Sequence, residues 1–257
     1  MANRFLRRAH ASEIACKLSA KAILEQGLIA GSDRILIAAS GGKDSSVMAW
    51  ALSSLKKSLQ ISYELAALHI STDFCACCKK SELAKKLDSW GISFTDLSVP
   101  VLGRLKPGRK MNCYWCSTQR RTELLKYAVE NGFNKIALGH HLDDIIETFF
   151  MNLCNKGELS AMPAKLVYRK IPVTLIRPLA YLEETQIIAC AAEQDILKAA
   201  CTCPYGANSK RLDMRKKIAA FTNNSGAVKR RILRAVLEQT SSGQELNLPL
   251  SELQNNS

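Results

Sequence analysis

An apolar run that ends in two glycines constrains the fold of this chain more than any other feature of the sequence. Residues 34–39 read RILIAA, which is typical of a buried strand, and residues 45–55 have apolar residues at helical spacing. Between them lies SGGKDS, residues 40–45. Gly41 and Gly42 allow the backbone to approach a ligand and to take positive φ angles, and the start of the next helix offers free N–H groups to an anion. The stretch therefore predicts a phosphate-binding loop at the end of a strand.

The side chains of this loop also suit a phosphate group. Lys43 can neutralise its charge, and Asp44 can cap the helix that follows. Hydroxyl hydrogen bonds can come from Ser40 and Ser45. The order of residues differs from the P-loop, in which Gly-Lys-Ser/Thr closes the motif. An ordinary Gly-Gly turn before a helix is the alternative interpretation.

Strands and helices alternate along the first 180 residues or so. Further strands are predicted at 63–70, 93–99, 135–138 and 173–176. Helices are predicted at 9–28, 45–55, 81–90, 118–130 and 143–155. This alternation predicts an α/β fold, with a mostly parallel sheet and helices on both faces. Such sheets bind ligands at the carboxyl ends of their strands.

The remainder of the chain reads as helical, with helices predicted at 183–194, 209–221 and 227–239. We therefore expect four parts: an N-terminal helical segment at 1–30, an α/β catalytic domain at 31–180, a helical C-terminal region at 181–240 and a disordered tail at 241–257. No stretch approaches the roughly 20 apolar residues of a membrane-spanning helix. No apolar signal core follows the basic start MANRFLRRAH, so a cytoplasmic protein without a membrane partner is predicted.

A second motif, GHHLDDIIET, follows the strand predicted at 135–138. Gly139 permits a tight exit from the strand, and His140 can hydrogen-bond to a nucleotide or a substrate. Asp143 and Glu147 share one helix face and can offer oxygen ligands to Mg²⁺. An acid-rich helix start is also favourable for the helix dipole alone. Because this motif and SGGKDS are expected at the same sheet edge, we predict that they form one nucleotide site.

The chain has 10 cysteines, and two short motifs hold several of them. MNCYWCSTQRR contains Cys113 and Cys116, and CTCPYG contains Cys201 and Cys203. In a chain without a secretory signal, clustered cysteines indicate metal binding or sulfur chemistry more often than disulfides. A zinc site and a simple disulfide both remain open at this point.

The net charge of +13 favours a polyanionic partner, of which nucleic acid is the commonest, over an effect on solubility alone. The cations that could track an RNA backbone lie mainly in the C-terminal helices: Lys210, Arg211, Arg215, Lys216, Lys217, Lys229, Arg230, Arg231 and Arg234. Further candidates are Arg7, Arg8, Lys106, Arg109, Lys110, Arg120 and Arg121.

The motifs together resemble a known group of proteins. SGGKDS resembles the PP-loop of the ATP pyrophosphatase superfamily, whose members cleave ATP to AMP and pyrophosphate and adenylate a carbonyl oxygen. SGGKDS, a C-x-x-C followed by arginines, GHHxDD, IRPLAY and a late C-x-C together resemble the tRNA 2-thiocytidine synthetase (TtcA) family, over roughly residues 10–235. The resemblance implies a Rossmann-like PP-loop domain and an ATP-dependent tRNA thiolase. The enzyme would adenylate the C2 oxygen of a cytidine, at position 32 of the anticodon loop, and replace it with sulfur.

The resemblance also implies cofactors, partners and residue roles. A [4Fe–4S] cluster would be held by Cys113, Cys116 and Cys203, with one iron open to sulfide. ATP would bind Gly139, His140 and the loop residues Ser40, Gly41, Gly42, Lys43, Asp44 and Ser45. Lys43, Asp44, Asp143 and Arg120 would be catalytic, with Asp143 also a Mg²⁺ ligand. The expected partners are tRNA, ATP and a sulfur donor such as a cysteine desulfurase, and the sequence leaves open whether the chain forms a homodimer.

Three alternatives share some of these features. A 2-thiouridine synthetase and a lysidine synthetase are related PP-loop enzymes, but lysidine chemistry needs no cysteines. A zinc-bearing RNA-binding protein without catalysis is a third, which the intact Lys43, Asp44 and Asp143 disfavour. Cys75, Cys77 and Cys78 are not part of the family pattern and are interpreted as buried thiols, a metal site or a sulfur relay. Cys16, Cys154 and Cys190 are predicted to lie in the core.

Overall fold

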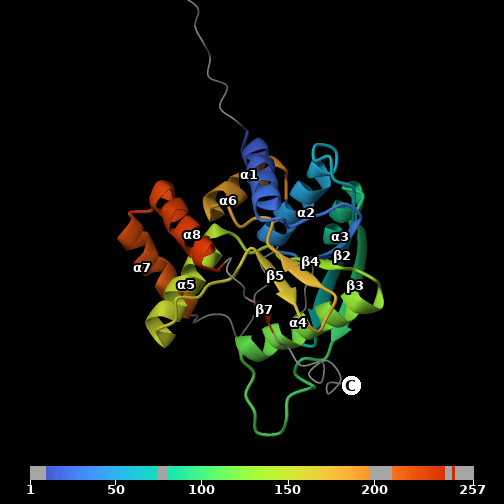
Figure 1. Ribbon diagram of the computed structural model, residues 1–257. Coiled ribbons are helices and arrows are strands. Elements are labelled where there is room, and N and C mark those ends of the chain that lie inside the picture. The colour runs from blue at the N-terminus through green and yellow to red at the C-terminus, as the bar shows by residue number, and fades with distance from the viewer. Residues whose placement is uncertain (1–9, 75–79, 197–209, 241–244, 247–257) are drawn as a thin grey trace, which may run out of the picture.

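The computed structural model describes residues 10–74, 80–196, 210–240 and 245–246 (Figure 1). These residues form a seven-stranded sheet in the order β3-β2-β1-β4-β6-β5-β7. The strands are β1 Asp33–Ala38, β2 Tyr63–Thr72, β3 Ser93–Val99, β4 Lys135–Ala137, β5 Lys165–Tyr168, β6 Thr174–Ile176 and β7 Glu245–Leu246. All neighbouring strands pair in parallel except β5 and β6, which are antiparallel. The predicted α/β fold with a mostly parallel sheet is therefore confirmed.

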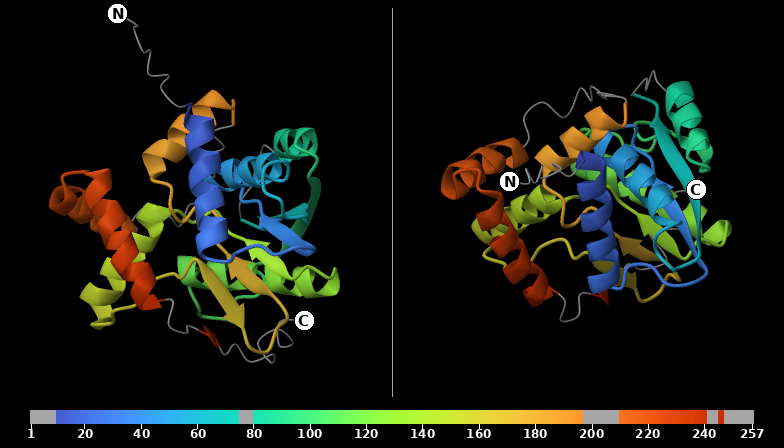
Figure 2. Two further views of the ribbon diagram at one scale, coloured as in Figure 1. Left: turned by 45° about the horizontal axis from the view of Figure 1, so that its top comes forward. Right: turned by 90° about the horizontal axis from the view of Figure 1, so that it is seen from above.

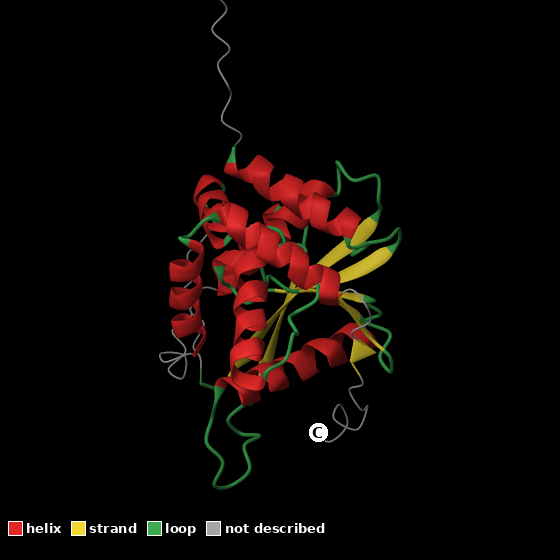
Figure 3. Cartoon of the chain, turned by 60° about the vertical axis from the view of Figure 1, so that its left-hand side comes forward, coloured by secondary structure: helices red, strands yellow, loops and turns green. Residues whose placement is uncertain are grey.

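Eight helices occur in the described part of the chain: α1 Ala11–Glu25, α2 Lys43–Leu55, α3 Lys80–Ser89, α4 Cys113–Glu130, α5 Leu142–Lys156, α6 Glu184–Glu193, α7 Lys210–Thr222 and α8 Gly226–Thr240. Figure 3 shows helices on both sides of the strands. α7 and α8 pack against α5, at the opposite end of the molecule from α3 (Figures 1 and 2). The described helices are all too short or too polar to cross a lipid bilayer.

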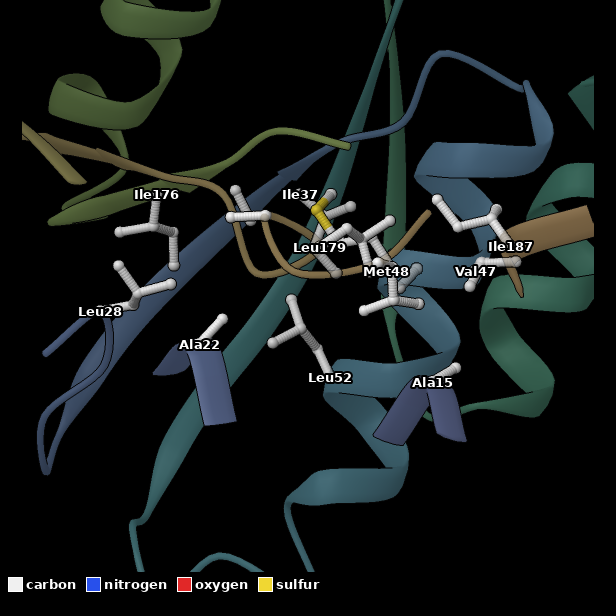
Figure 4. Packing of buried hydrophobic residues seen from close by; sticks show 14 of the residues in the cluster. Ala15, Ala22, Leu28, Ile37, Val47, Met48, Leu52, Ile176, Leu179 and Ile187 are labelled. Carbon is white, nitrogen blue, oxygen red and sulfur yellow. The ribbon is translucent and has the colours of Figure 1, made fainter. Parts of the chain in front are cut away.

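Alternate residues of the central strand face two separate apolar cores, as the period of a strand requires. Ile35 and Ile37 pack into the core with α1, α2 and α6, where Met48 and Leu52 of α2 are buried (Figure 4). Leu36 faces the other core, beneath α4. Because both faces are covered, the middle strands read as continuous apolar runs.

The order of the strands places a crevice at the site of the predicted motifs. From β1 the chain moves to β2 and β3 on one side of the sheet, and then returns to β4 on the other side of β1. The strand order therefore reverses between β1 and β4, and parallel sheets bind ligands at such a point, beyond the carboxyl ends of the strands. SGGKDS follows β1 and GHHLDD follows β4, so both motifs reach this crevice.

Three elements differ from the prediction. α4 begins at Cys113 rather than at residue 118, because the side chain of Asn112 accepts a hydrogen bond from Trp115 N at 2.8 Å and caps the helix. β5 was not predicted, and its alternating exposed and buried residues are those of a half-buried strand. β7 lies within the segment expected to be a disordered tail, where it pairs with β5.

Candidate functional site

The SGGKDS loop is held in shape by its own serines. Gly41 has φ of 79°, in the left-handed region that favours glycine. Ser40 Oγ lies 2.9 Å from Ser45 Oγ and accepts a hydrogen bond from Gly42 N at 3.3 Å. Ser45 Oγ in turn donates to Gly42 O at 3.0 Å. The loop thus presents its backbone and the start of α2 in one defined conformation.

Gly139 brings the second motif into contact with this loop. A Cβ atom at position 139 would lie 2.9 Å from the backbone nitrogen of Ser45 and 3.1 Å from the carbonyl carbon of Asp44. Neither neighbour is the flexible end of a side chain, so the two backbones can approach this closely only without a side chain at position 139. The end of β4 therefore packs directly on the start of α2.

A cavity of about 390 Å³ opens between the two motifs and α4. This volume is within the usual range of small-molecule sites. Its polar lining comes from Ser40, Asp44, Ser45, Ser117, Arg120, Arg121, Gly139, His140 and Asp144. Its apolar lining comes from the ends of the strands and from α4, including Leu68, Ile70, Leu125, Ile136 and Leu175. The structure thus brings Arg120 together with five of the predicted nucleotide residues: Ser40, Asp44, Ser45, Gly139 and His140. The other three, Gly41, Gly42 and Lys43, are not among the residues that line the cavity.

The C-x-x-C pair lies directly before the part of α4 that lines this cavity, which begins at Ser117. Cys113 is exposed and Cys116 is half-buried, and both are in the first turn of α4. Arg120, one helical turn beyond Cys116, lines the cavity. Two thiols on one turn beside an open cavity fit two ligands of a metal cluster that must reach a bound substrate. The predicted third ligand, Cys203, lies outside the described residues, as do Cys201, Cys75, Cys77 and Cys78.

Similarity to known proteins agrees with this arrangement. The family model of the PP-loop domain matches residues 12–198. The tRNA-cytidine(32) 2-sulfurtransferase of Syntrophotalea carbinolica is 37% identical over 205 residues, which are 78% of this chain and 78% of that protein. The protein of the same name from Geobacter sulfurreducens is 35% identical over 222 residues, or 84% of this chain and 86% of that one. The chain belongs to the tRNA-cytidine(32) 2-sulfurtransferase family.

Two solved structures have a fold similar to that of this chain. The U34-tRNA thiolase NcsA from Methanococcus maripaludis, solved with its [4Fe-4S] cluster, has a TM-score of 0.77 at 22% identity, over 94% of this chain and 84% of that one. NMN synthetase from Francisella tularensis has a TM-score of 0.53 at 14% identity, over 94% of this chain and 99% of that one. The segment that the PP-loop family model matches, residues 12–198, includes α1 to α6 and ends before α7.

A buried arginine that does not itself line the cavity acts on two residues that do, His140 and Arg121. Arg177, from the IRPLAY segment, is 5% exposed and donates a hydrogen bond to Pro163 O. Within the described residues it has no carboxylate at ion-pair distance. Burial and the nearby Arg121 lower the pKa of Arg177 to about 10. Burial and Arg177 in turn lower the pKa of His140 to about 4, so this imidazole is neutral at physiological pH.

The two aspartates of GHHLDD have different surroundings. Asp143 Oδ1 lies 2.7 Å from Lys229 Nζ, and its Oδ2 accepts a hydrogen bond from Glu184 N at 2.7 Å. Burial would raise the pKa of Asp143, but these hydrogen bonds hold it below its usual value. Asp143 does not line the cavity, whereas Asp144 does. The structure therefore places Asp144, not the predicted Asp143, beside the phosphate loop.

Lys43 is held by a carboxylate that the motif did not reveal. Its Nζ lies 3.0 Å from Asp44 Oδ1 and 3.0 Å from Glu184 Oε1 at the start of α6. Burial would lower the pKa of Lys43, but the hydrogen bonds with Glu184 and Asp44 raise it. Glu184 Oε2 also lies 3.0 Å from Arg215 Nη1. The phosphate-loop lysine is thus linked through α6 to α7, a link that sequence spacing could not predict.

The structure also tests the cysteines predicted to lie in the core. Cys190 is fully buried, and Cys16 on α1 is half-buried against the same core. Burial raises the pKa of Cys190 to about 12, which makes it a poor nucleophile. Cys154 is exposed on α5, so its predicted place in the core is wrong.

Proposed function

We propose that this protein is an ATP-dependent tRNA thiolase that replaces the C2 oxygen of cytidine 32 with sulfur. The observation that supports this most directly is the single cavity shared by the phosphate loop and α4, since α4 carries Cys113 and Cys116 in its first turn. The thiol pair lies one helical turn from residues that line this cavity. That arrangement suits a reaction that joins ATP chemistry to sulfur transfer.

ATP binding follows from the geometry of the loop. Its phosphates would accept hydrogen bonds from the backbone of the SGGKDS loop and lie at the positive end of the α2 dipole. Asp44 and Asp144, the carboxylates that line the cavity, would hold Mg²⁺, which prefers oxygen ligands. Arg120 and Arg121 face the same space and would stabilise the charge of the adenylate and of the pyrophosphate that leaves.

The reaction would proceed in two displacements. The C2 oxygen of the cytidine attacks the α-phosphorus of ATP, and pyrophosphate leaves. Sulfide then adds to the activated C2 carbon, the C2–O bond breaks, and AMP leaves with the oxygen. Neutral His140, at the cavity wall, can donate or accept a hydrogen bond without changing its charge.

The thiol pair fits a [4Fe–4S] cluster with Cys203 as the third ligand. Such a cluster, when bound, would supply an iron position that is open to sulfide. Cys113 is exposed at the start of α4, one helical turn before the lining residue Ser117, and this position suits a group that must meet an incoming base. We propose that the sulfide comes from a donor such as a cysteine desulfurase and that the protein acts in the cytoplasm.

The test uses protein purified without oxygen, unmodified tRNA, ATP labelled at the α-phosphate, and sulfide. We expect AMP, pyrophosphate and 2-thiocytidine, identified by mass spectrometry of the digested nucleosides. Formation of ADP would contradict the assignment of adenylation to this site. Formation of 2-thiouridine in place of 2-thiocytidine would instead support the 2-thiouridine synthetase alternative.

A further inference from the structure

The cations of the C-terminal helices are largely occupied by carboxylates of this chain. Arg215 lies 2.5 Å from Glu147 and 3.0 Å from Glu184. The other pairs are Arg211 with Asp144 and Glu147, Lys229 with Asp143, Arg230 with Glu183, and Lys217 with Asp213. All of these pairs except Lys217 with Asp213, which lies within α7, join α7 or α8 to α5 or to the start of α6. The cations that sequence analysis assigned to an RNA surface therefore serve in large part to hold the helices together.

A second group of cations lies in the loop at residues 100–112, between β3 and α4, which we call the basic loop. It projects from the body of the protein beside α4 (Figures 1 and 3). Lys106, Arg109 and Lys110 are exposed there, and within the part of the chain that the structure describes none of them has an ion-pair partner. An extended segment with unpaired cations is suited to a phosphate backbone.

The base of this loop is anchored, so its position relative to the cavity is defined. Arg104 Nη1 lies 2.7 Å from Glu123 Oε1 on α4. Leu102 N and Gly103 N both donate to the carboxylate of Asp73 at 3.0 Å. Trp115 Nε1 donates to the carbonyl oxygen of residue 101 at 3.1 Å and so joins the start of α4 to the loop.

An exposed aromatic ring follows the basic loop, in the first turn of α4. Tyr114, between the two cysteines of C-x-x-C, is 81% exposed, whereas its neighbour Trp115 is half-buried against the core under α4. Helical spacing places Tyr114 on the same face as Ser117 and Arg121, which line the cavity. The fold gains little from a ring so exposed, and its helix face, shared with two lining residues, leaves the ring available to a ligand.

We propose that the basic loop and Tyr114 bind the unpaired loop of the substrate RNA, with a base next to the target stacked on the ring of Tyr114. Cations and an exposed aromatic side chain are the usual elements of single-stranded RNA binding. The phosphates would lie along Lys106, Arg109 and Lys110, while the target base enters the cavity past Cys113. This inference rests on the proposed function, because it assumes that the ligand of the site is RNA.

The first experiment compares two sets of charges. Lys106, Arg109 and Lys110 are changed to alanine in one variant, and Lys216, Arg231 and Arg234, exposed cations of α7 and α8, in the other. Binding of an anticodon stem–loop RNA is measured at several salt concentrations. Loss of three contacts to a single strand should flatten the slope of log K against log salt by about 2 for the loop variant. A flattened slope in the C-terminal variant alone would overturn the proposal.

The second experiment examines the ring of Tyr114. RNA with 2-aminopurine at one loop position at a time should lose fluorescence at a position next to the target when it binds wild-type protein or Tyr114→Phe. Tyr114→Leu should abolish this loss and weaken binding roughly 5- to 150-fold, because a stacked base is lost. Phe221→Leu removes another exposed ring, 70% exposed on α7, and serves as the matched control.

Iron content and thiolation are measured on the same preparations. If Tyr114→Leu loses its iron, the residue acts through the cysteines and the stacking role is overturned. If wild-type protein makes no 2-thiocytidine but the RNA-binding pattern holds, only the proposed function fails. If wild-type protein thiolates RNA and the Tyr114 and loop variants bind it normally, only the proposed surface fails.

Discussion

Replacing Gly139 with alanine tests how closely the two motifs must approach. The new Cβ would lie 2.9 Å from Ser45 N, whereas ordinary contacts begin at 3.4 Å, so the loop or β4 must move by about 0.5 Å. Overpacking of this kind costs about 1–3 kcal/mol of unfolding free energy. For a chain of this size, that lowers the melting temperature by roughly 2–12 °C. The same movement displaces the backbone that would hold phosphate, so we expect ATP affinity to fall roughly 10-fold.

The measurement is thermal unfolding by circular dichroism together with ATP binding by calorimetry. Gly31→Ala is the matched control, because a Cβ atom there meets nothing within 4 Å and the residue does not have positive φ. It should leave ATP binding unchanged and the melting temperature unchanged or slightly raised. If Gly139→Ala matched Gly31→Ala in both measurements, the argument from close backbone approach would be refuted.

Three further predictions concern single residues of the site. Calorimetry should show weaker binding of Mg²⁺ and ATP to Asp144→Asn, because Asp144 lines the cavity. Asp143→Asn should mainly lower the melting temperature, because Asp143 pairs with Lys229. The reverse result would restore Asp143 as the metal ligand. Below pH 6.5 the unfolded chain protonates His140, whereas the folded protein does so only near pH 4. Acidification across this window should therefore lower the free energy of unfolding by up to about 3 kcal/mol. In denaturant titrations, His140→Asn should remove that part of the pH dependence. Cys113→Ala should remove iron from anaerobically purified protein yet leave ATP binding intact, and retention of iron would exclude Cys113 as a ligand.

Much of the site could be predicted from the order of the motifs along the chain. Parallel strands present their carboxyl ends at one edge, so motifs that directly follow β1 and β4 must meet there. Glycine at positions 41 and 139 follows from the same local geometry, since one has positive φ and the other lies against a neighbouring backbone. The motifs and their spacing also indicated the family that the sequence comparison shows.

Only the tertiary structure decided which neighbouring side chain faces the cavity. Successive helical residues point about 100° apart, and the rotation of α5 is set by the burial of Leu142, Ile145 and Ile146. That rotation directs Asp144 to the phosphate loop and Asp143 to Lys229. The pairing of C-terminal cations with carboxylates likewise depends on how α7 and α8 pack on α5, a contact between residues far apart in the chain. Net charge follows from the sequence, but which charges are available to a partner depends on the pairs that packing creates.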